Sequence, residues 1–222
     1  QPGRLGHVFV GCYSGRVVEV APDGEVLRRF RAHEGAVKAV RLHPQQPMGL
    51  SCSADGEVKA WSFDGETIRT FPGHMAIVND IDLDAGGQRL ATVGRDFCLR
   101  IFDVASGEIL WTERLGFRSL KSVCFATIDT VVVGDYWGSV FVVNLSASVV
   151  HRYKIATNGI SSLALGANGH VVAASYDGSV SIIDPQTGGV LQRVEAMQQR
   201  RVIAAPQTPA PPHAPQTLGF TA

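Results

Sequence analysis

A repeat of about 41 residues runs through most of the chain and constrains its fold more than any other feature. Five segments share the same pattern of a polar turn, a short strand-like run and a second polar turn. The central residues of these segments are Val20, Trp61, Phe102, Val143 and Ile183, spaced by 41, 41, 41 and 40 residues. Such a regular period predicts a fold assembled from one supersecondary unit repeated along the chain.

Each repeat contains four strand-like runs. In the second repeat these runs are 36–42, 48–53, 57–63 and 66–71. Apolar and polar residues alternate within them, which is typical of half-buried antiparallel strands. Asp-Gly pairs at 55–56 and 64–65 favour tight hairpin turns. Four antiparallel strands in about 40–45 residues predict an all-β chain whose units are the blades of a β-propeller.

Charge and composition exclude several kinds of partner. The chain carries 20 Lys and Arg against 20 Asp and Glu, so net charge gives no reason to expect nucleic acid. No apolar run approaches the roughly 18 residues of a membrane span, and the first residues do not resemble a signal peptide. We therefore expect protein partners, with no nucleic acid and no membrane span.

The four cysteines are Cys12, Cys52, Cys98 and Cys124. None belongs to a CxxC pair, and none has zinc-finger spacing to a histidine. Each lies in a strand-like apolar run, where a free cysteine behaves as a small hydrophobic residue. We expect reduced thiols and an intracellular, cytoplasmic protein, while a disulfide framework is the alternative.

The turns and strand ends of the repeat resemble the WD40 repeat family. Three features carry the resemblance: a Gly-His pair before the first strand, an Asp in the turn before the third strand, and a Trp-Asp pair ending that strand. Their counterparts are Gly73-His74 and the variant Ala32-His33; Asp55, Asp96 and Asp177; and Trp61-Ser62, Phe102-Asp103 and Ile183-Asp184. No repeat keeps an unaltered Trp-Asp pair, and Val143-Asn144 and Val20-Ala21 depart furthest.

The resemblance implies five blades, of which the first lacks its innermost strand. The expected blades are about 7–32, 36–71, 77–113, 119–154 and 160–195. Most WD40 rings have seven blades, and an open ring exposes unpaired strand edges. We therefore expect residues 1–196 to be part of a larger seven-bladed ring, completed by the same polypeptide or else by a partner. Residues 197–222 are rich in Pro, Ala and Gln, which predicts a tail without a core.

Serine, histidine and aspartate gather in residues 51–74 and raise the possibility of a catalytic triad. A catalytic site is expected once in a domain, however, whereas these residues partly recur at the blade period. The resemblance implies instead a structural hydrogen-bond network inside each blade. Its expected members are His33, Ser51, Ser53, Asp55, Trp61, His74, Asp96 and Asp177. In the fourth blade, Phe117 stands near the expected histidine position and Trp137 replaces the aspartate, so we expect apolar packing to dominate there.

The resemblance also implies a partner-binding face, because the residue before the turn aspartate tends to lie on the top surface of WD40 blades. Those positions hold Tyr13, Ala54, Arg95, Tyr136 and Tyr176, and Phe117 and Met75 in the loops that enter the first strands could join them. Tyrosine and arginine are enriched at binding hot spots. The alternative is that the tyrosines only cover strand ends.

No catalytic motif is present: the sequence lacks GxxxxGK[ST], HExxH and GxSxG. We expect no catalytic residues, no cofactor and no metal. The predicted function is a non-catalytic scaffold for protein–protein interaction within a multiprotein assembly. One alternative is a sensor or autoinhibitory domain of a larger signalling protein. A propeller enzyme is a further alternative, and it would need ligands clustered around the central channel.

Overall fold

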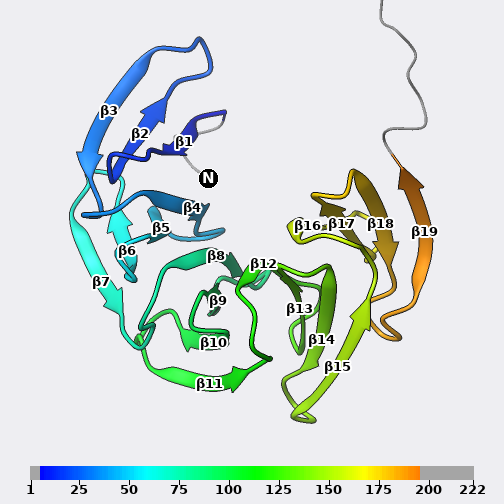
Figure 1. Ribbon diagram of the computed structural model, residues 1–222. Coiled ribbons are helices and arrows are strands. Elements are labelled where there is room, and N and C mark those ends of the chain that lie inside the picture. The colour runs from blue at the N-terminus through cyan, green and yellow to red at the C-terminus, as the bar shows by residue number, and fades with distance from the viewer. Residues whose placement is uncertain (1–5, 196–222) are drawn as a thin grey trace, which may run out of the picture.

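The computed structural model describes residues 6–195, which form five antiparallel sheets of consecutive strands (Figure 1). Blade 1 has three strands: β1 (Val8–Gly11), β2 (Arg16–Val20) and β3 (Val26–Arg31). Blade 2 has four: β4 (Val37–Leu42), β5 (Met48–Ser53), β6 (Val58–Ser62) and β7 (Thr67–Phe71). Blade 3 follows with β8 (Val78–Leu83), β9 (Arg89–Gly94), β10 (Cys98–Asp103) and β11 (Ile109–Arg114).

The last two blades repeat the same order. Blade 4 contains β12 (Leu120–Phe125), β13 (Thr130–Asp135), β14 (Ser139–Asn144) and β15 (Val149–Lys154). Blade 5 contains β16 (Ile160–Leu165), β17 (Val171–Ser175), β18 (Ser179–Ile183) and β19 (Val190–Glu195). The prediction of an all-β chain with four-stranded antiparallel blades is confirmed. Among residues 6–195 there is no helix long and apolar enough to cross a membrane.

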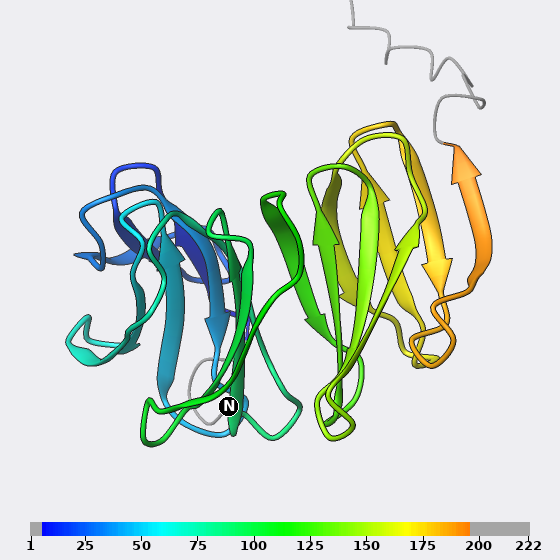
Figure 2. The same cartoon turned by 60° about the horizontal axis from the view of Figure 1, so that its bottom comes forward.

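The blades stand side by side in an arc, with the first strand of each four-stranded blade inside and the last strand outside (Figure 1). Neighbouring blades contact each other through these inner strands, from β4 to β8, β8 to β12 and β12 to β16. Strands of every blade run between the same two faces of the arc (Figure 2). Completion into a seven-bladed ring stays a prediction, and the Pro-rich tail lies outside the described residues.

The hydrophobic core lies between blades, so the strands are packed on both sides. In β13 the run Val131–Val133 is fully buried because Val131 and Val133 face blade 3 while Val132 faces blade 5. Successive side chains of a strand point to opposite faces, and here both faces are covered by neighbouring blades. Polar and apolar residues therefore do not alternate, which explains the continuous apolar run. Between blades 2 and 3 the corresponding core contains Leu50, Ile81 and Phe102.

Blade 1 differs from the others because the described residues contain no strand inside β1. Val8 is 56% exposed and Val10 is 45% exposed, whereas every residue of the equivalent strand β5 is buried. The first blade is therefore incomplete in the described residues, as its sequence predicts. All four cysteines are free, and burial raises the pKa of the Cys124 thiol to about 12.

Charged side chains on the inner strands tie three blades together. Arg41 of β4 donates to Asp82 at 3.2 Å and to Asp80 at 3.3 Å, both on β8. The same two carboxylates accept the backbone N–H groups of Val123 at 3.0 Å and Phe125 at 2.9 Å, on β12. An inner strand is a sheet edge with free N–H groups, so these contacts satisfy donors that would otherwise lack a protein partner. We call this set the inner-strand clamp.

Candidate interaction face and the blade networks

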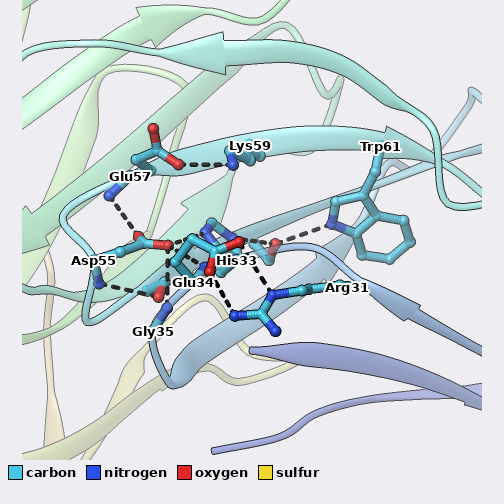
Figure 3. Close-up of polar contacts among 10 residues, drawn as sticks. Arg31, His33, Glu34, Gly35, Asp55, Glu57, Lys59 and Trp61 are labelled. Atoms are coloured by element: carbon cyan, nitrogen blue, oxygen red, sulfur yellow. Dashed lines mark hydrogen bonds and ion pairs between the residues drawn. The ribbon is translucent and has the colours of Figure 1, made fainter. Parts of the chain in front are cut away.

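Blade 2 contains a continuous chain of side-chain hydrogen bonds (Figure 3). His33, in the loop before β4, places Nδ1 3.1 Å from Asp55 Oδ2 and Nε2 2.8 Å from Ser51 Oγ. Trp61 Nε1 donates to the same Ser51 Oγ at 3.0 Å. Ser53 stands outside this chain, where its Oγ accepts the N–H of Asp55 at 3.1 Å. The chain ties the loop before β4 to strands β5 and β6.

Electrostatics favour a neutral histidine beside a charged aspartate. Burial lowers the pKa of His33, although the Asp55 carboxylate opposes this effect. Burial alone would raise the pKa of Asp55, but the N–H of Glu57 and the His33 ring hold that pKa below its ordinary value. A neutral His33 can donate from Nδ1 to Asp55 and accept the Ser51 hydroxyl at Nε2.

The order Ser51, His33, Asp55 has the connectivity of a catalytic triad, yet its environment is that of a core. Ser51 is fully buried, and Trp61 N–H already occupies its oxygen. A nucleophile needs access to a substrate and a nearby group that stabilises the oxyanion. The buried serine has no such access, so the geometry serves stability.

His33, Asp55 and Glu57 also offer donor atoms that all lie within 4.8 Å of one another, as a metal site would require. Each group is already engaged by the protein. His33 and the N–H of Glu34 contact Asp55, while the Glu57 carboxylate pairs with Lys59 at 2.7 Å. The hydrogen bonds therefore account for the grouping.

Blade 3 keeps the histidine and aspartate but replaces the tryptophan arm. His74 lies 3.0 Å from Asp96 and 2.7 Å from Thr92 Oγ1, and Arg100 donates to Asp96 at 2.7 Å. Burial would raise the pKa of Asp96, but His74 and Arg100 bring it well below the ordinary value. Phe102 takes the place of Trp61 and packs on Phe71 at 5.4 Å between ring centres.

Blades 4 and 5 have no histidine at the equivalent place. Leu115 and Ala156 stand there and are buried. In blade 5, Asp177 accepts the N–H groups of Thr157 at 2.8 Å and Ser179 at 2.9 Å. In blade 4 the carboxylate comes from Asp135 instead, which is buried and accepts two backbone N–H groups of its own turn.

The top face is formed by the loops before the inner strands and the turns between the second and third strands. The predicted partner-binding residues all lie there and are exposed. Tyr13 is 85% exposed, Met75 93% and Phe117 78%; Tyr136 and Tyr176 are each more than half exposed, and Arg95 is exposed as well. These aromatic and cationic side chains come from four different blades.

Two lysines that the sequence reasoning missed join this face. Each inner strand from β4 to β16 has a register shift near its start, and the extra residues include Lys38 in β4 and Lys121 in β12. Lys38 lies over the Tyr13 ring at 5.4 Å, and Lys121 lies over the Tyr136 ring at 5.9 Å. Such bulges commonly redirect a side chain at functional surfaces.

The positive charges of the two lysines and Arg95 lie close enough to repel one another. Burial, followed by the charges of Lys38 and Arg95, lowers the pKa of Lys121. No ion pair within residues 6–195 joins any of these three cations to a carboxylate. We call Lys38, Arg95 and Lys121 the cation cluster; Lys38 and Arg95 are exposed, and Lys121 is half-buried.

The fold and the networks define a class of protein: a repeat β-propeller in which blades 2 and 3 contain internal chains of polar side chains. Comparison with known families agrees. The sequence model of the WD domain, G-beta repeat family matches residues 24–62, 65–103 and 147–184, together more than half of the chain. The protein belongs to the WD40 repeat family. The unmatched stretch between the second and third matches contains most of blade 4, the blade without His and turn Asp.

Curated relatives are distant. Eukaryotic translation initiation factor 3 subunit I of Vanderwaltozyma polyspora is 25% identical over 190 residues, covering 75% of this chain and 54% of the relative. Small ribosomal subunit protein RACK1y of Oryza sativa subsp. japonica is 28% identical over 163 residues, covering 68% and 48%. Pre-mRNA-processing factor 19 of Caenorhabditis elegans is 32% identical over 87 residues, covering 39% and 18%. The chain thus spans about half the length of the first two.

Proposed function

We propose that this protein is a non-catalytic scaffold for protein–protein interaction within a multiprotein assembly, and that it binds a partner through its top face. The observation that carries this proposal is the combination of exposed Tyr13, Tyr136 and Tyr176 with the cation cluster. Tyrosines supply large apolar contact area with a polar end, and arginine and tyrosine dominate binding hot spots.

The relatives support an assembly role, since one is named as a subunit of a translation initiation factor and another as a protein of the small ribosomal subunit. A cytoplasmic location agrees with those names and with four free cysteines. An enzymatic role has no comparable support, because the serine of the triad-like chain is buried. A sensor domain of a signalling protein remains the alternative function.

The experiment is a pull-down with the tagged full chain carrying Tyr136→Ala and Tyr176→Ala, followed by identification of the captured proteins. We expect the specific partner set to be lost. The matched control is Ile68→Ala, which also removes an exposed apolar side chain, but on the outer strand β7. Retention of all partners by the tyrosine variant, with a folded circular-dichroism spectrum, would reject the top face as the binding surface.

A further inference from the structure

Blade 4 has a cavity where blades 2 and 3 hold their histidine–aspartate contacts. Its volume is about 510 Å³, and its walls include Phe117, Arg118, Asp135, Trp137, Arg152 and Lys154. The loop before β12, the turn between β13 and β14, and the strand β15 contribute these residues. The cavity therefore opens on the top face.

The cavity lies where blade 4 lacks the histidine–aspartate hydrogen bond between loop and turn. In blade 3, His74 spans this space to reach Asp96. In blade 4 the equivalent Leu115 turns into the apolar core beside Phe141, and Trp137 at the aspartate position is 51% exposed. Within the described residues of blade 4, the loop meets the turn through the Arg118 guanidinium over the Trp137 ring, and no histidine–aspartate hydrogen bond joins them.

Three cations surround the cavity. The Arg118 guanidinium stacks over the Trp137 ring at 4.8 Å, and Lys154 donates to the Trp137 carbonyl. Arg152 donates to Ser139 Oγ at 2.9 Å and lies 3.5 Å from the Asp135 carboxylate. In the described part of the chain, neither Arg118 nor Lys154 pairs with a carboxylate.

One carboxylate thus faces three cations, and that carboxylate is already engaged. Asp135 accepts the N–H groups of Trp137 and Ser139, each at 2.8 Å. The wall residues therefore carry a net charge of about +2, beside the exposed aromatic rings of Phe117 and Trp137. An anion with two negative charges would complement this arrangement.

We propose that the blade 4 cavity binds a phosphorylated serine or threonine side chain of a protein partner. A phosphoserine carries a charge of about −1.5 to −2 at neutral pH and three acceptor oxygens, which suits two guanidinium groups and an ammonium group. A glutamate side chain would balance only half of the charge. This inference rests on the proposed function, since it specifies the chemistry of a partner on the same face.

The binding test uses a fluorescein-labelled degenerate peptide library with phosphoserine at its centre, titrated with the full chain and followed by anisotropy. We expect binding at least about ten-fold tighter than for the glutamate-centred and unphosphorylated libraries. Arg118→Gln should weaken phosphopeptide binding about ten-fold or more. The matched control is Arg29→Gln, which removes one exposed positive charge from β3 in blade 1.

The inference would be overturned by equal binding of the glutamate-centred and phosphoserine-centred libraries, or by an unchanged affinity of the Arg118→Gln variant. A single-stranded RNA oligonucleotide that displaces the phosphopeptide from this site with higher affinity would also overturn it. The pull-down separates this inference from the proposed function. Partners that are lost with the Tyr136 and Tyr176 substitutions, but retained after phosphatase treatment and with Arg118→Gln, would support the scaffold and reject the phosphate site.

Discussion

The polar network of blade 3 allows a quantitative prediction of how the substitution Asp96→Asn changes the free energy of unfolding. Asp96→Asn keeps the size of the side chain but removes the charge that faces His74 and Arg100. The side chains of His74 and Arg100 are 1% and 10% exposed, so water cannot replace the lost partner. Arg100 would be left as a nearly buried cation beside a neutral amide.

The expected magnitude follows from that burial. Charge-assisted hydrogen bonds contribute about 1.5–3 kcal/mol each, and removal of one partner from a buried ion pair costs about 3–5 kcal/mol. We therefore expect Asp96→Asn to lower the free energy of unfolding by about 3–5 kcal/mol. Asp177→Asn is the matched change in blade 5, where most contacts are to backbone N–H and Ser or Thr groups that an amide oxygen can still accept. That change should cost only about 1 kcal/mol.

The assay is urea unfolding of the full chain, combined with amide hydrogen exchange to locate the loss. Repeat proteins can unfold in parts, so exchange in β9 and β10 must accelerate more than exchange in blade 5. Equal losses from the two substitutions would refute the reasoning, because they would show that the buried charge of Asp96 contributes no more than the shape of its side chain.

Further predictions concern the pH response and the packing of blade 2. Burial raises the pKa of Asp80 to about 6, even though the charge of Arg41 opposes this shift. In the unfolded chain the pKa of an aspartate is about 3.9, so between pH 6 and pH 4 the folded state binds a proton that the unfolded state does not. Stability from this group should therefore rise as pH falls from 7 to 4, by roughly 2–3 kcal/mol, and urea titrations of Asp80→Asn should lack this increment. Trp61→Phe removes the donor to Ser51 and should lower the free energy of unfolding in urea by about 1–2 kcal/mol. An unchanged free energy of unfolding would show that this hydrogen bond does not stabilise the blade. Gly49→Ala would place a Cβ 2.1 Å from the Trp61 ring, so calorimetry should show a loss of about 1–3 kcal/mol or more; a neutral result would contradict the close packing.

The repeat period made much of this structure predictable. His33 and His74 differ by one period, as do Asp55 and Asp96, so their equivalent positions follow from counting once the repeat is recognised. Thr92 could have been found in the same way, because it lies 41 residues after Ser51.

Other contacts could not be found by counting positions along the repeat. Arg100 sits one period after Lys59, but only the three-dimensional turn shows that it reaches Asp96. Lys121 owes its place to a bulge that shifts the register of β12 by one residue. Asp135 replaces a missing turn aspartate from a position two residues earlier, and no period marks such a substitution. Clustering of charge from separate blades likewise depends on how the blades are set around the arc.

The order of the sheets has a consequence for how the chain reaches its structure. Within each blade, every strand pairs only with strands adjacent in sequence, so all the hairpins close over short stretches of chain. Folding rates rise as contacting residues lie closer in sequence, since less loop entropy is lost before contacts form. A blade could therefore form soon after its last strand leaves the ribosome and then serve as the surface on which the next blade assembles.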